Sequence, residues 1–313
     1  MELLQVMEPV LSGMVMEGDE WVHQIKWDGI RGITYIENGS LRLFTKSGRE
    51  RTPFYPEVKD TLSLLHGHQA ILDGELIVLD ENSRPSFRFA LTRDRLKNEG
   101  NLPVYLKKYP VHYIVFDILF HNGKDLRNFP LVERKFILNE NLSKNARIGI
   151  TDDFSNGPDL YNLMKERSFE GIVSKKKSSI YLEGKKHNLW FKTKFIKKIL
   201  AVIGGLSWKS GLPNSLLLGI YTDAKLSFIG NASLGLTQHD FSLLKDYSPA
   251  IQQKHSPFHN LQKAKDVTWL SPVLTCWVSF LEWTDQSSLR HPKILGFSQE
   301  KATSANGKEY SAE

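Results

Sequence analysis

Residues 26–32, with the sequence KWDGIRG, separate two short runs in which apolar and polar side chains alternate. The runs cover residues 21–25 and 33–36, and alternation with a period of two is typical of half-buried β-strands. The Asp-Gly pair between them indicates a turn, because glycine tolerates the positive φ of tight corners. The sequence therefore predicts a β-hairpin, with Lys26 in a sharp and partly desolvated bend.

A lysine in such a bend has the chemistry of a nucleophile. Free lysine has a pKa of about 10.4, so roughly one amine in a few thousand is neutral at pH 7. Burial and neighbouring cations lower that pKa, and we expect both at Lys26. The alternative is a hairpin-edge lysine that only keeps the strand solvated, and a short motif alone favours this alternative.

Length and composition limit the classes of protein to which the chain can belong. Its 313 residues have room for two domains, and its net charge of +6 permits a polyanionic partner. The single cysteine, Cys276, rules out an internal disulfide and a cysteine-based zinc site. The longest apolar run, residues 199–206, is far shorter than the ~20 residues of a membrane span. We expect an intracellular, cytoplasmic protein without a membrane partner.

Strands and helices are mixed in the first part of the chain rather than alternating regularly, which predicts an α+β domain. The expected strands, besides those already named, are residues 41–44, 70–79 (two runs around an acidic turn), 111–119, 170–175 and 189–194. The expected helices are residues 58–65, 131–142 and 159–167, and residues 84–106 are expected to form a loop with one helix.

The texture changes beyond Lys198, where glycines and short apolar runs dominate and a single helix is expected at residues 238–253. Short strands with glycine-rich turns and one helix predict a small all-β barrel of the OB type. We therefore expect an α+β domain over residues 1–196 and an OB-fold domain over residues 197–313. The polar tail from about residue 302 is expected to be disordered.

Six segments resemble, in order, the motifs of the covalent nucleotidyltransferase superfamily, which contains ATP-dependent DNA ligases, RNA ligases and mRNA capping enzymes. They are Lys26 to Arg31, Thr45 to Gly48, Asp73-Gly74-Glu75, Phe116-Asp117, Glu170 to Val173, and Trp190 to Lys194. Further on, Glu282 to Thr284, Leu289 to Pro292 and Gly296 to Lys301 resemble the end of the OB domain in bacterial ATP-dependent DNA ligases. The motifs and their order are most similar to those of ligase modules of the end-joining type and of free-standing bacterial ligases.

The resemblance implies a reaction in three steps. Lys26 attacks the α-phosphate of ATP and becomes a lysine-adenylate as pyrophosphate leaves. The adenylate passes to the 5′-phosphate at a nick, and the 3′-hydroxyl then displaces AMP. Positioning and charge neutralisation provide most of the catalysis in such displacements.

The resemblance also implies a set of site residues. Lys26, Lys192 and Lys194 are the expected catalytic residues, and Glu75 and Glu170 are the expected ligands of Mg²⁺ or Mn²⁺. The expected nucleotide contacts are Ile25, Arg31, Lys46, Glu75, Phe116, Lys192, Lys194, Arg290 and Lys301. Phe116 would stack on adenine, although a plain core phenylalanine is the alternative, and both glutamates could simply end strands in water.

Two segments depart from the family pattern. Lys46 stands where arginine is usual, which replaces a bidentate phosphate contact by a single one. Residues 296–301 read GFSQEK, whereas relatives usually read Gly-x-Arg-x-Asp-Lys. Because that motif acts in lysine adenylation, Ser298 and Glu300 are expected to slow the first step more than sealing.

The chain is thus expected to be an ATP-dependent DNA ligase. An RNA ligase or a capping-type nucleotidyltransferase is the alternative within the same chemistry, and a non-catalytic nucleic-acid clamp is the alternative of another class. The expected partners are nicked duplex DNA and an end-binding or other repair protein on a separate chain. The protein itself is expected to be a monomer.

Overall fold

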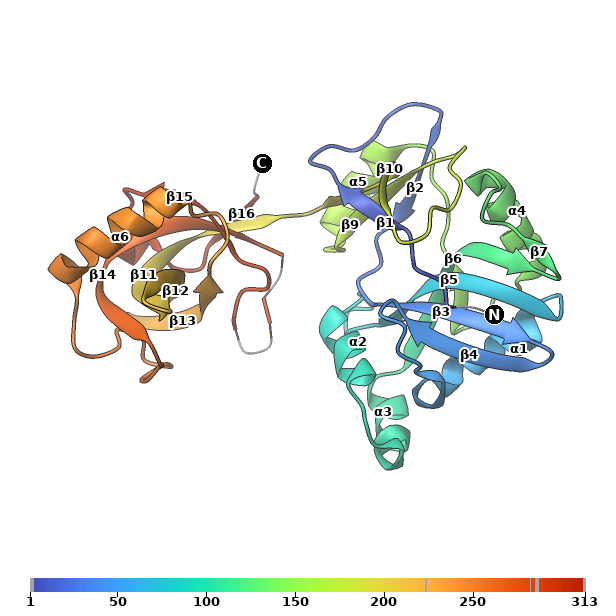
Figure 1. Cartoon of the computed structure of the whole chain (residues 1–313), viewed down its shortest axis with the longest axis horizontal. Coiled ribbons are helices and arrows are strands. Elements are labelled where there is room, and N and C mark those ends of the chain that lie inside the picture. The colour runs from blue at the N-terminus through green and yellow to red at the C-terminus, as the bar shows by residue number, and fades with distance from the viewer. Residues whose placement is uncertain (1–2, 223, 282, 285–286, 312–313) are drawn as a thin grey trace. The chain divides into compact units, whose positions relative to one another are not determined.

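The computed structural model describes residues 3–222, 224–281, 283–284 and 287–311. The chain forms two compact units, one ending at Lys194 and the other beginning at Phe195 (Figure 1). The sequence had placed this boundary two residues later, after residue 196. Among the described residues, the helices are all too short or too polar to cross a bilayer.

The first unit contains two β-sheets. The four-stranded sheet has the order β1-β10-β9-β2, in which β1 runs parallel to β10. Its strands are β1 (Glu8–Leu11), β2 (Trp21–Ile25), β9 (Gly171–Lys176) and β10 (Lys186–Lys194). The six-stranded sheet has the order β4-β3-β5-β6-β7, and β8 pairs in parallel with β6. Its strands are β3 (Ile30–Glu37), β4 (Ser40–Thr45), β5 (Gln69–Val78), β6 (Val111–His121), β7 (Lys124–Asp125) and β8 (Ile148–Ile150).

The helices of the first unit are short. They are α1 (Thr61–Leu64), α2 (Phe87–Asp94), α3 (Leu102–Lys108), α4 (Leu131–Asn141) and α5 (Gly157–Glu166), with 3₁₀ turns at Thr52–Phe54, Pro56–Asp60 and Glu99–Asn101. The prediction of a single helix within residues 84–106 is wrong, because two helices, α2 and α3, begin there. The Ser86 hydroxyl caps α2, and Pro103 occupies the first turn of α3, where its missing N–H costs nothing.

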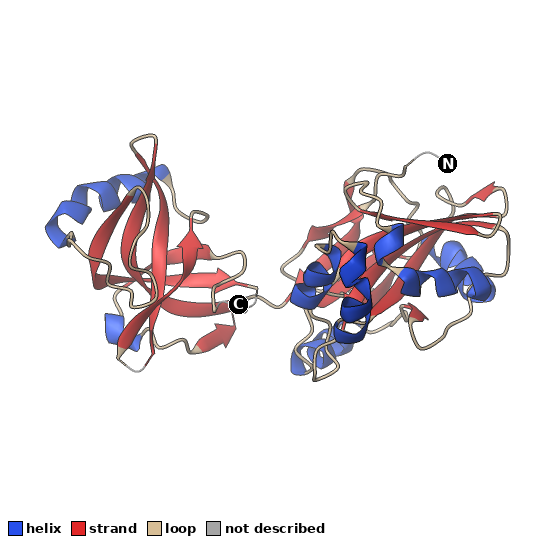
Figure 2. Cartoon of the chain, turned by 90° about the horizontal axis from the view of Figure 1, so that it is seen from below, coloured by secondary structure: helices blue, strands red, loops and turns tan. Residues whose placement is uncertain are grey.

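The six-stranded sheet is buried on both faces. On one face, strand residues such as Leu72 and Val115 pack against Ala90 of α2 and Leu138 of α4, so that the helices cover this face (Figure 2). On the other face, a second cluster that includes Ile33 joins the sheet to the N-terminal segment and to the four-stranded sheet. The second face of the six-stranded sheet is therefore turned towards the four-stranded sheet.

The hairpin expected around Lys26 is wrong. Strand β2 pairs with β9 in the four-stranded sheet, whereas β3 pairs with β4 and β5 in the six-stranded sheet. Residues 26–29 therefore cross from one sheet to the other. Gly29 is needed there for space rather than for a positive φ, because a Cβ atom on it would lie 2.3 Å from the Leu76 carbonyl oxygen.

The acidic turn expected within residues 70–79 is also wrong. Asp73, Gly74 and Glu75 lie inside the continuous strand β5, whose pairing with β6 shifts register between Asp73 and Gly74. Gly74 is required by close packing, since a Cβ atom on it would lie 2.7 Å from the Ile114 carbonyl oxygen. Asp73 and Glu75 are two residues apart in a strand, so both side chains face the space between the sheets.

The second unit is an OB-type β-barrel. Its sheet has the order β13-β12-β11-β14-β15. The strands are β11 (Lys197–Lys209), β12 (Leu212–Thr222), β13 (Lys225–Ala232), β14 (Val267–Phe280) and β15 (Lys293–Ser298), and the helix is α6 (Gln238–Ile251). The Leu289 amide, between β14 and β15, donates to the Ile229 carbonyl of β13 at 2.7 Å. The Ile294 amide of β15 donates to the Leu234 carbonyl, just after β13, at 2.9 Å, so the two edges of the sheet meet. Five strands in a partly open barrel are typical of the OB fold.

The tail expected to be disordered is instead part of this barrel. Residues Ala302–Ser304 form a 3₁₀ turn, and β16 (Glu309–Ser311) pairs with the start of β11. Ala305 is fully buried between these elements. The polar composition of the tail concealed these contacts.

Candidate active site

A cavity of about 560 Å³ lies between the two sheets of the first unit. This volume is in the range of ligand-binding pockets. It is bordered by the crossover at residues 26–29, by residues from β1, β2, β3, β5, β6, β9 and β10, by the end of β4 with the turn that follows it, and by the end of α2. Of the predicted site residues, the cavity is lined by Ile25, Lys26, Arg31, Lys46, Glu75, Phe116 and Lys192.

The side chain of Lys26 lies between carboxylates. Its backbone amide donates to the Gly171 carbonyl at 3.0 Å, which holds the crossover against β9. Its Nζ donates to Glu170 Oε2 at 2.6 Å, and Nζ of Lys194 lies 2.5 Å from Glu170 Oε1. Glu170 directly precedes β9, so one carboxylate joins the nucleophile candidate to β10.

These contacts reverse the expected direction of the Lys26 pKa. Burial disfavours the charged amine, but the carboxylates of Glu170, Glu75 and Asp28 outweigh burial and raise the pKa above its usual value. The prediction of a lowered pKa was therefore wrong. In this environment the Lys26 amine keeps its proton at pH 7.

Glu75 has an unusual environment for a carboxyl group. Burial is the main cause that raises the pKa of Glu75 to about 8, and Lys26 and Arg31 only partly oppose it. Glu170 has the opposite behaviour, because Lys26 and Lys194 outweigh burial and lower its pKa. The two predicted metal ligands thus belong to different sheets and differ in protonation at pH 7.

Phe116 is not a plain core residue, because its half-buried side chain lines the cavity. The guanidinium of Arg31 lies 5.1 Å from the ring centroid, and Nζ of Lys175 lies 4.4 Å from it. The next residue, Asp117, is fully buried and accepts two hydrogen bonds of 2.8 Å from Arg134 of α4. That ion pair fixes the strand that carries the ring.

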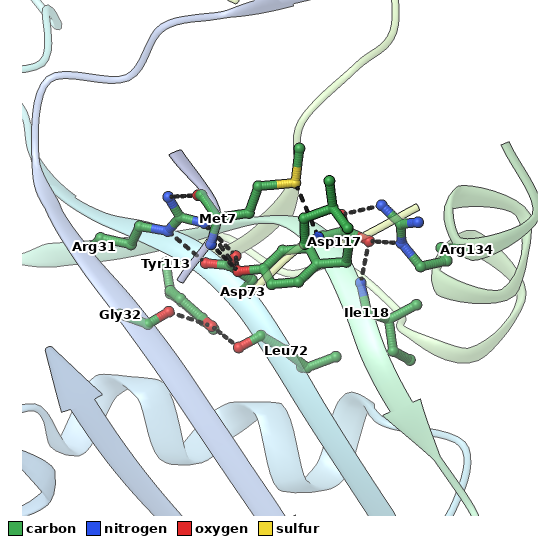
Figure 3. A network of polar contacts seen from close by, with 11 residues as sticks. Met7, Arg31, Gly32, Leu72, Asp73, Tyr113, Asp117, Ile118 and Arg134 are labelled. Carbon is green, nitrogen blue, oxygen red and sulfur yellow. Dashed lines mark hydrogen bonds and ion pairs between the residues drawn. The ribbon is translucent and has the colours of Figure 1, made fainter. Parts of the chain in front are cut away.

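Arg31 is the centre of a polar network between the sheets (Figure 3). Its guanidinium donates to both carboxylate oxygens of Asp73, to the Met7 carbonyl at 2.8 Å and to the Tyr181 hydroxyl at 3.2 Å. The Tyr181 hydroxyl also donates to Asp73 at 2.8 Å. Arg31 borders the cavity, and its guanidinium nitrogens anchor the N-terminal segment to the six-stranded sheet; its nucleotide contact stays a prediction.

Two predicted residues, Arg290 and Lys301, belong to the second unit. Lys301 is exposed, and its carbonyl accepts the Ser304 amide at 2.9 Å. The Arg290 carbonyl accepts the Leu281 amide at 3.1 Å. Glu282, which contributed to the predicted C-terminal pattern, lies outside the described residues. The nucleotide contacts of Arg290 and Lys301 stay predictions.

Sequence reasoning did not single out Lys175 as a site residue. Lys175 is buried at 3% exposure, lines the cavity, and its Nζ has no hydrogen-bond partner among the described residues. The Nζ lies 4.2 Å from the Trp190 ring centroid, and burial lowers its pKa to about 7. The alternation of β9 could have revealed it, since Lys175 shares a strand face with Val173 of the cavity.

Family profiles match both units. The profile described as "ATP dependent DNA ligase domain" matches residues 4–194, and "ATP dependent DNA ligase C terminal region" matches residues 209–301. The chain belongs to the ATP-dependent DNA ligases. The ligase is 32% identical over 292 residues to the "Multifunctional non-homologous end joining protein LigD" of Mycolicibacterium smegmatis, covering 90% of this chain and 36% of the relative.

Two further proteins show the same relationship. The ligase is 27% identical over 310 residues to a "DNA ligase" of Thermoplasma volcanium, covering 87% of this chain and 52% of that one. The crystal structure of the ligase domain of Mycobacterium tuberculosis LigD superposes with a TM-score of 0.55 at 26% identity, covering 97% of this chain and 98% of that one. The ligase thus spans between about a third and a half of the curated relatives named here.

Proposed function

We propose that this ligase seals nicks between a 5′-phosphate and a 3′-hydroxyl in duplex DNA through a Lys26 adenylate. The observation that carries the proposal is the placement of Lys26 in a ligand-sized cavity, 2.6 Å from the carboxylate that it shares with Lys194. Lys192 and Glu75 line the same cavity, and Glu170, which pairs with both Lys26 and Lys194, lies beside it. This set of groups suits nucleotidyl transfer.

In the first step, the neutral Lys26 amine forms a bond to the α-phosphorus of ATP as the bond to pyrophosphate breaks. Lys192 and Lys194 stabilise the negative charge on the phosphoryl oxygens. In the second step, a 5′-phosphate oxygen attacks the same phosphorus and Lys26 leaves. The 3′-hydroxyl then attacks the DNA phosphate, loses its proton and releases AMP.

Glu75 and Glu170 fit a divalent cation that is shared with the nucleotide. Mg²⁺ usually takes one or two carboxylates and fills its remaining positions with water and phosphate oxygens. The described residues contain no group of three or more acidic, histidine or cysteine ligands, so a cation here depends on substrate oxygens. Such an ion supplies charge neutralisation to the triphosphate. Mg²⁺ is the proposed ion, with Mn²⁺ as a substitute.

Phe116 is proposed to stack on the base, and Ile25 is proposed to border it from the end of β2. Lys175 is proposed to contact the nucleotide as well, because an unpartnered buried amine in the cavity needs an acceptor. The proposed partners are nicked duplex DNA and a repair protein on a separate chain. The end-joining names of several relatives support the second partner.

Mass spectrometry after incubation with ATP and Mg²⁺ tests the proposal. We expect one added AMP on Lys26, which disappears in Lys26→Arg, a variant that keeps the charge beside Glu170. Parallel reactions with ATP and GTP, followed by nicked DNA or nicked RNA, distinguish the DNA ligase from an RNA ligase or capping-type enzyme. Absence of the adduct in the parent chain, with pyrophosphate removed enzymatically, would leave the clamp as the better explanation.

A further inference from the structure

One carboxylate of the cavity wall does not belong to the groups assigned above. Glu8, the first residue of β1, lines the cavity together with Lys46 and Lys192. Its Oε2 lies 2.7 Å from Nζ of Lys46. The side chains of Glu8 and Lys46 are 27% and 53% exposed, so the pair stands where solvent and ligands reach it.

The backbone at Glu8 is fixed from both sides. Met7 is fully buried, its carbonyl accepts from Arg31 at 2.8 Å, and its amide donates to the Tyr181 hydroxyl at 3.1 Å. The Glu8 amide donates to the Lys185 carbonyl at 2.9 Å. The network around Arg31 therefore positions the Glu8 carboxylate, which keeps only the freedom of its own side chain.

The charges around Glu8 are those that would surround a bound phosphate. Partial burial raises the pKa of Glu8, but Lys46, Lys186 and Lys192 outweigh burial and lower it, so the group stays ionised. Lys186 is its neighbour across the β1–β10 pairing. Lys192 conversely lies close enough to Lys194 and Lys26 that burial and these two cations lower its pKa. A further anion would relieve that repulsion.

A second ion pair at the same rim differs in kind. Arg49 pairs with Asp94, whose side chain is only 8% exposed and also accepts from Arg51 and the Tyr55 hydroxyl at 3.2 Å each. Asp94 is thus held by several buried donors and is structural. The exposed pair of Glu8 and Lys46 is of the weak kind that competing anions displace.

We propose that Glu8 is a built-in competitor at the phosphate subsite that the family resemblance implies for Lys46 and Lys192, and that its carboxylate leaves Lys46 when a phosphate group enters. The inference rests on the proposed function for the source of that phosphate, which is either the triphosphate of ATP or the 5′-phosphate of a nick. A phosphate carries more charge and more acceptor oxygens than a carboxylate, so it replaces Glu8 at Lys46. The competing Glu8 carboxylate thus lowers the apparent affinity of the subsite for phosphate.

The variant Glu8→Gln tests this because it keeps the shape of the side chain and removes the charge. Binding is measured by calorimetry at low salt with inorganic tripolyphosphate, with ATP, and with nicked DNA that carries or lacks the 5′-phosphate. We expect binding to tighten about threefold to tenfold for the phosphate source that uses the subsite, and the gain to shrink at high salt. Glu50→Gln, which breaks the exposed Arg42–Glu50 pair of 2.7 Å outside the cavity lining, is the matched control.

The double variant Glu8→Gln/Lys46→Met completes the cycle. The gain from Glu8→Gln should vanish when Lys46 is absent. Unchanged or weaker binding of every probe in Glu8→Gln, or a gain that persists without Lys46, overturns the proposal, as does a lower melting temperature with unaltered affinities. Because the readout is binding, it separates this inference from the proposed function, which fails on the missing Lys26 adduct.

Discussion

Nζ of Lys26 lies 2.6 Å from Oε2 of Glu170, so the proposed nucleophile is paired with an anion. An amine in such a pair keeps its proton and does not attack phosphorus. Nucleotide binding must therefore weaken this pairing as well as position the α-phosphate.

The pH dependence of self-adenylation should report this pairing. Because the pKa of Lys26 is raised, the neutral fraction grows about tenfold per pH unit across the neutral range. Single-turnover adenylation at saturating ATP should rise with that slope between about pH 6 and 8. A profile that is already flat at pH 6 would show that nucleotide binding removes the proton in a separate, fast step.

Metal binding should release a proton from Glu75. The pKa of this carboxyl is raised to about 8, so at pH 7 the group is mostly protonated and must ionise to hold a cation. Calorimetry with Mg²⁺ and ATP at pH 7 in buffers of different ionisation enthalpy should give close to one released proton. The release should fall towards zero at pH 9. Glu75→Gln is the control, and an unchanged proton count in this variant would contradict the assignment.

Replacement of Lys175 should stabilise the fold and weaken nucleotide binding. The pKa of Lys175 is about 7 in the folded protein and ~10.4 in the unfolded chain, so between these pH values the folded protein binds fewer protons. The charged amine therefore destabilises the fold fully below pH 7, and this cost in the free energy of unfolding decreases as the pH rises above 7. Lys175→Met should therefore raise the free energy of unfolding by on the order of 2 kcal/mol at pH 6 and by less at pH 9. Urea unfolding and ATP titration measure both effects, and a destabilised variant would refute the expectation.

Loss of Arg31 should lower the free energy of unfolding, because it leaves a buried carboxylate without its ion-pair partner. Arg31→Ala leaves the fully buried Asp73 without its ion pair, which should lower the free energy of unfolding by about 3–5 kcal/mol. The exposed pair of Arg42 and Glu50 provides the comparison, since Arg42→Ala should cost less than about 1 kcal/mol. Equal costs in urea unfolding would contradict the structural importance of Arg31.

The C-terminal departures should slow the first step more than they slow sealing. Ser298 ends β15, and its hydroxyl accepts the Glu300 amide at 3.1 Å. Ser298→Arg restores the usual residue of the family pattern and should accelerate single-turnover adenylation several-fold. Sealing of pre-adenylated nicked DNA should be unchanged. Equal effects on both reactions, or none on either, would argue against a dedicated function of this motif.

The sequence revealed the order of the motifs and the type of most elements, because both depend on local patterns. It misplaced Asp73 and Glu75 in a turn, since acidic residues inside an apolar run are poor packing unless a cavity receives them. It also misjudged Lys26, because local alternation does not reveal that β2 and β3 belong to different sheets.

Long-range pairing explains the remaining errors. The sign of the Lys26 pKa depends on Glu170, which is 144 residues away in the chain, and no local pattern predicts that contact. The same holds for the Met7 carbonyl that Arg31 binds and for the strand at residues 309–311 that a polar tail concealed. Burial of Lys175 depends on Trp190 of the neighbouring strand β10 and on Phe116 of β6 in the other sheet.

Glu75 lies on β5 of one sheet, and Glu170 directly precedes β9 of the other. A divalent ion bound by both carboxylates would link the two sheets of the first unit. Metal and nucleotide loading would then make melting of this unit dependent on their concentrations. The same bound ion would then contribute both to the reaction and to the stability of the first unit.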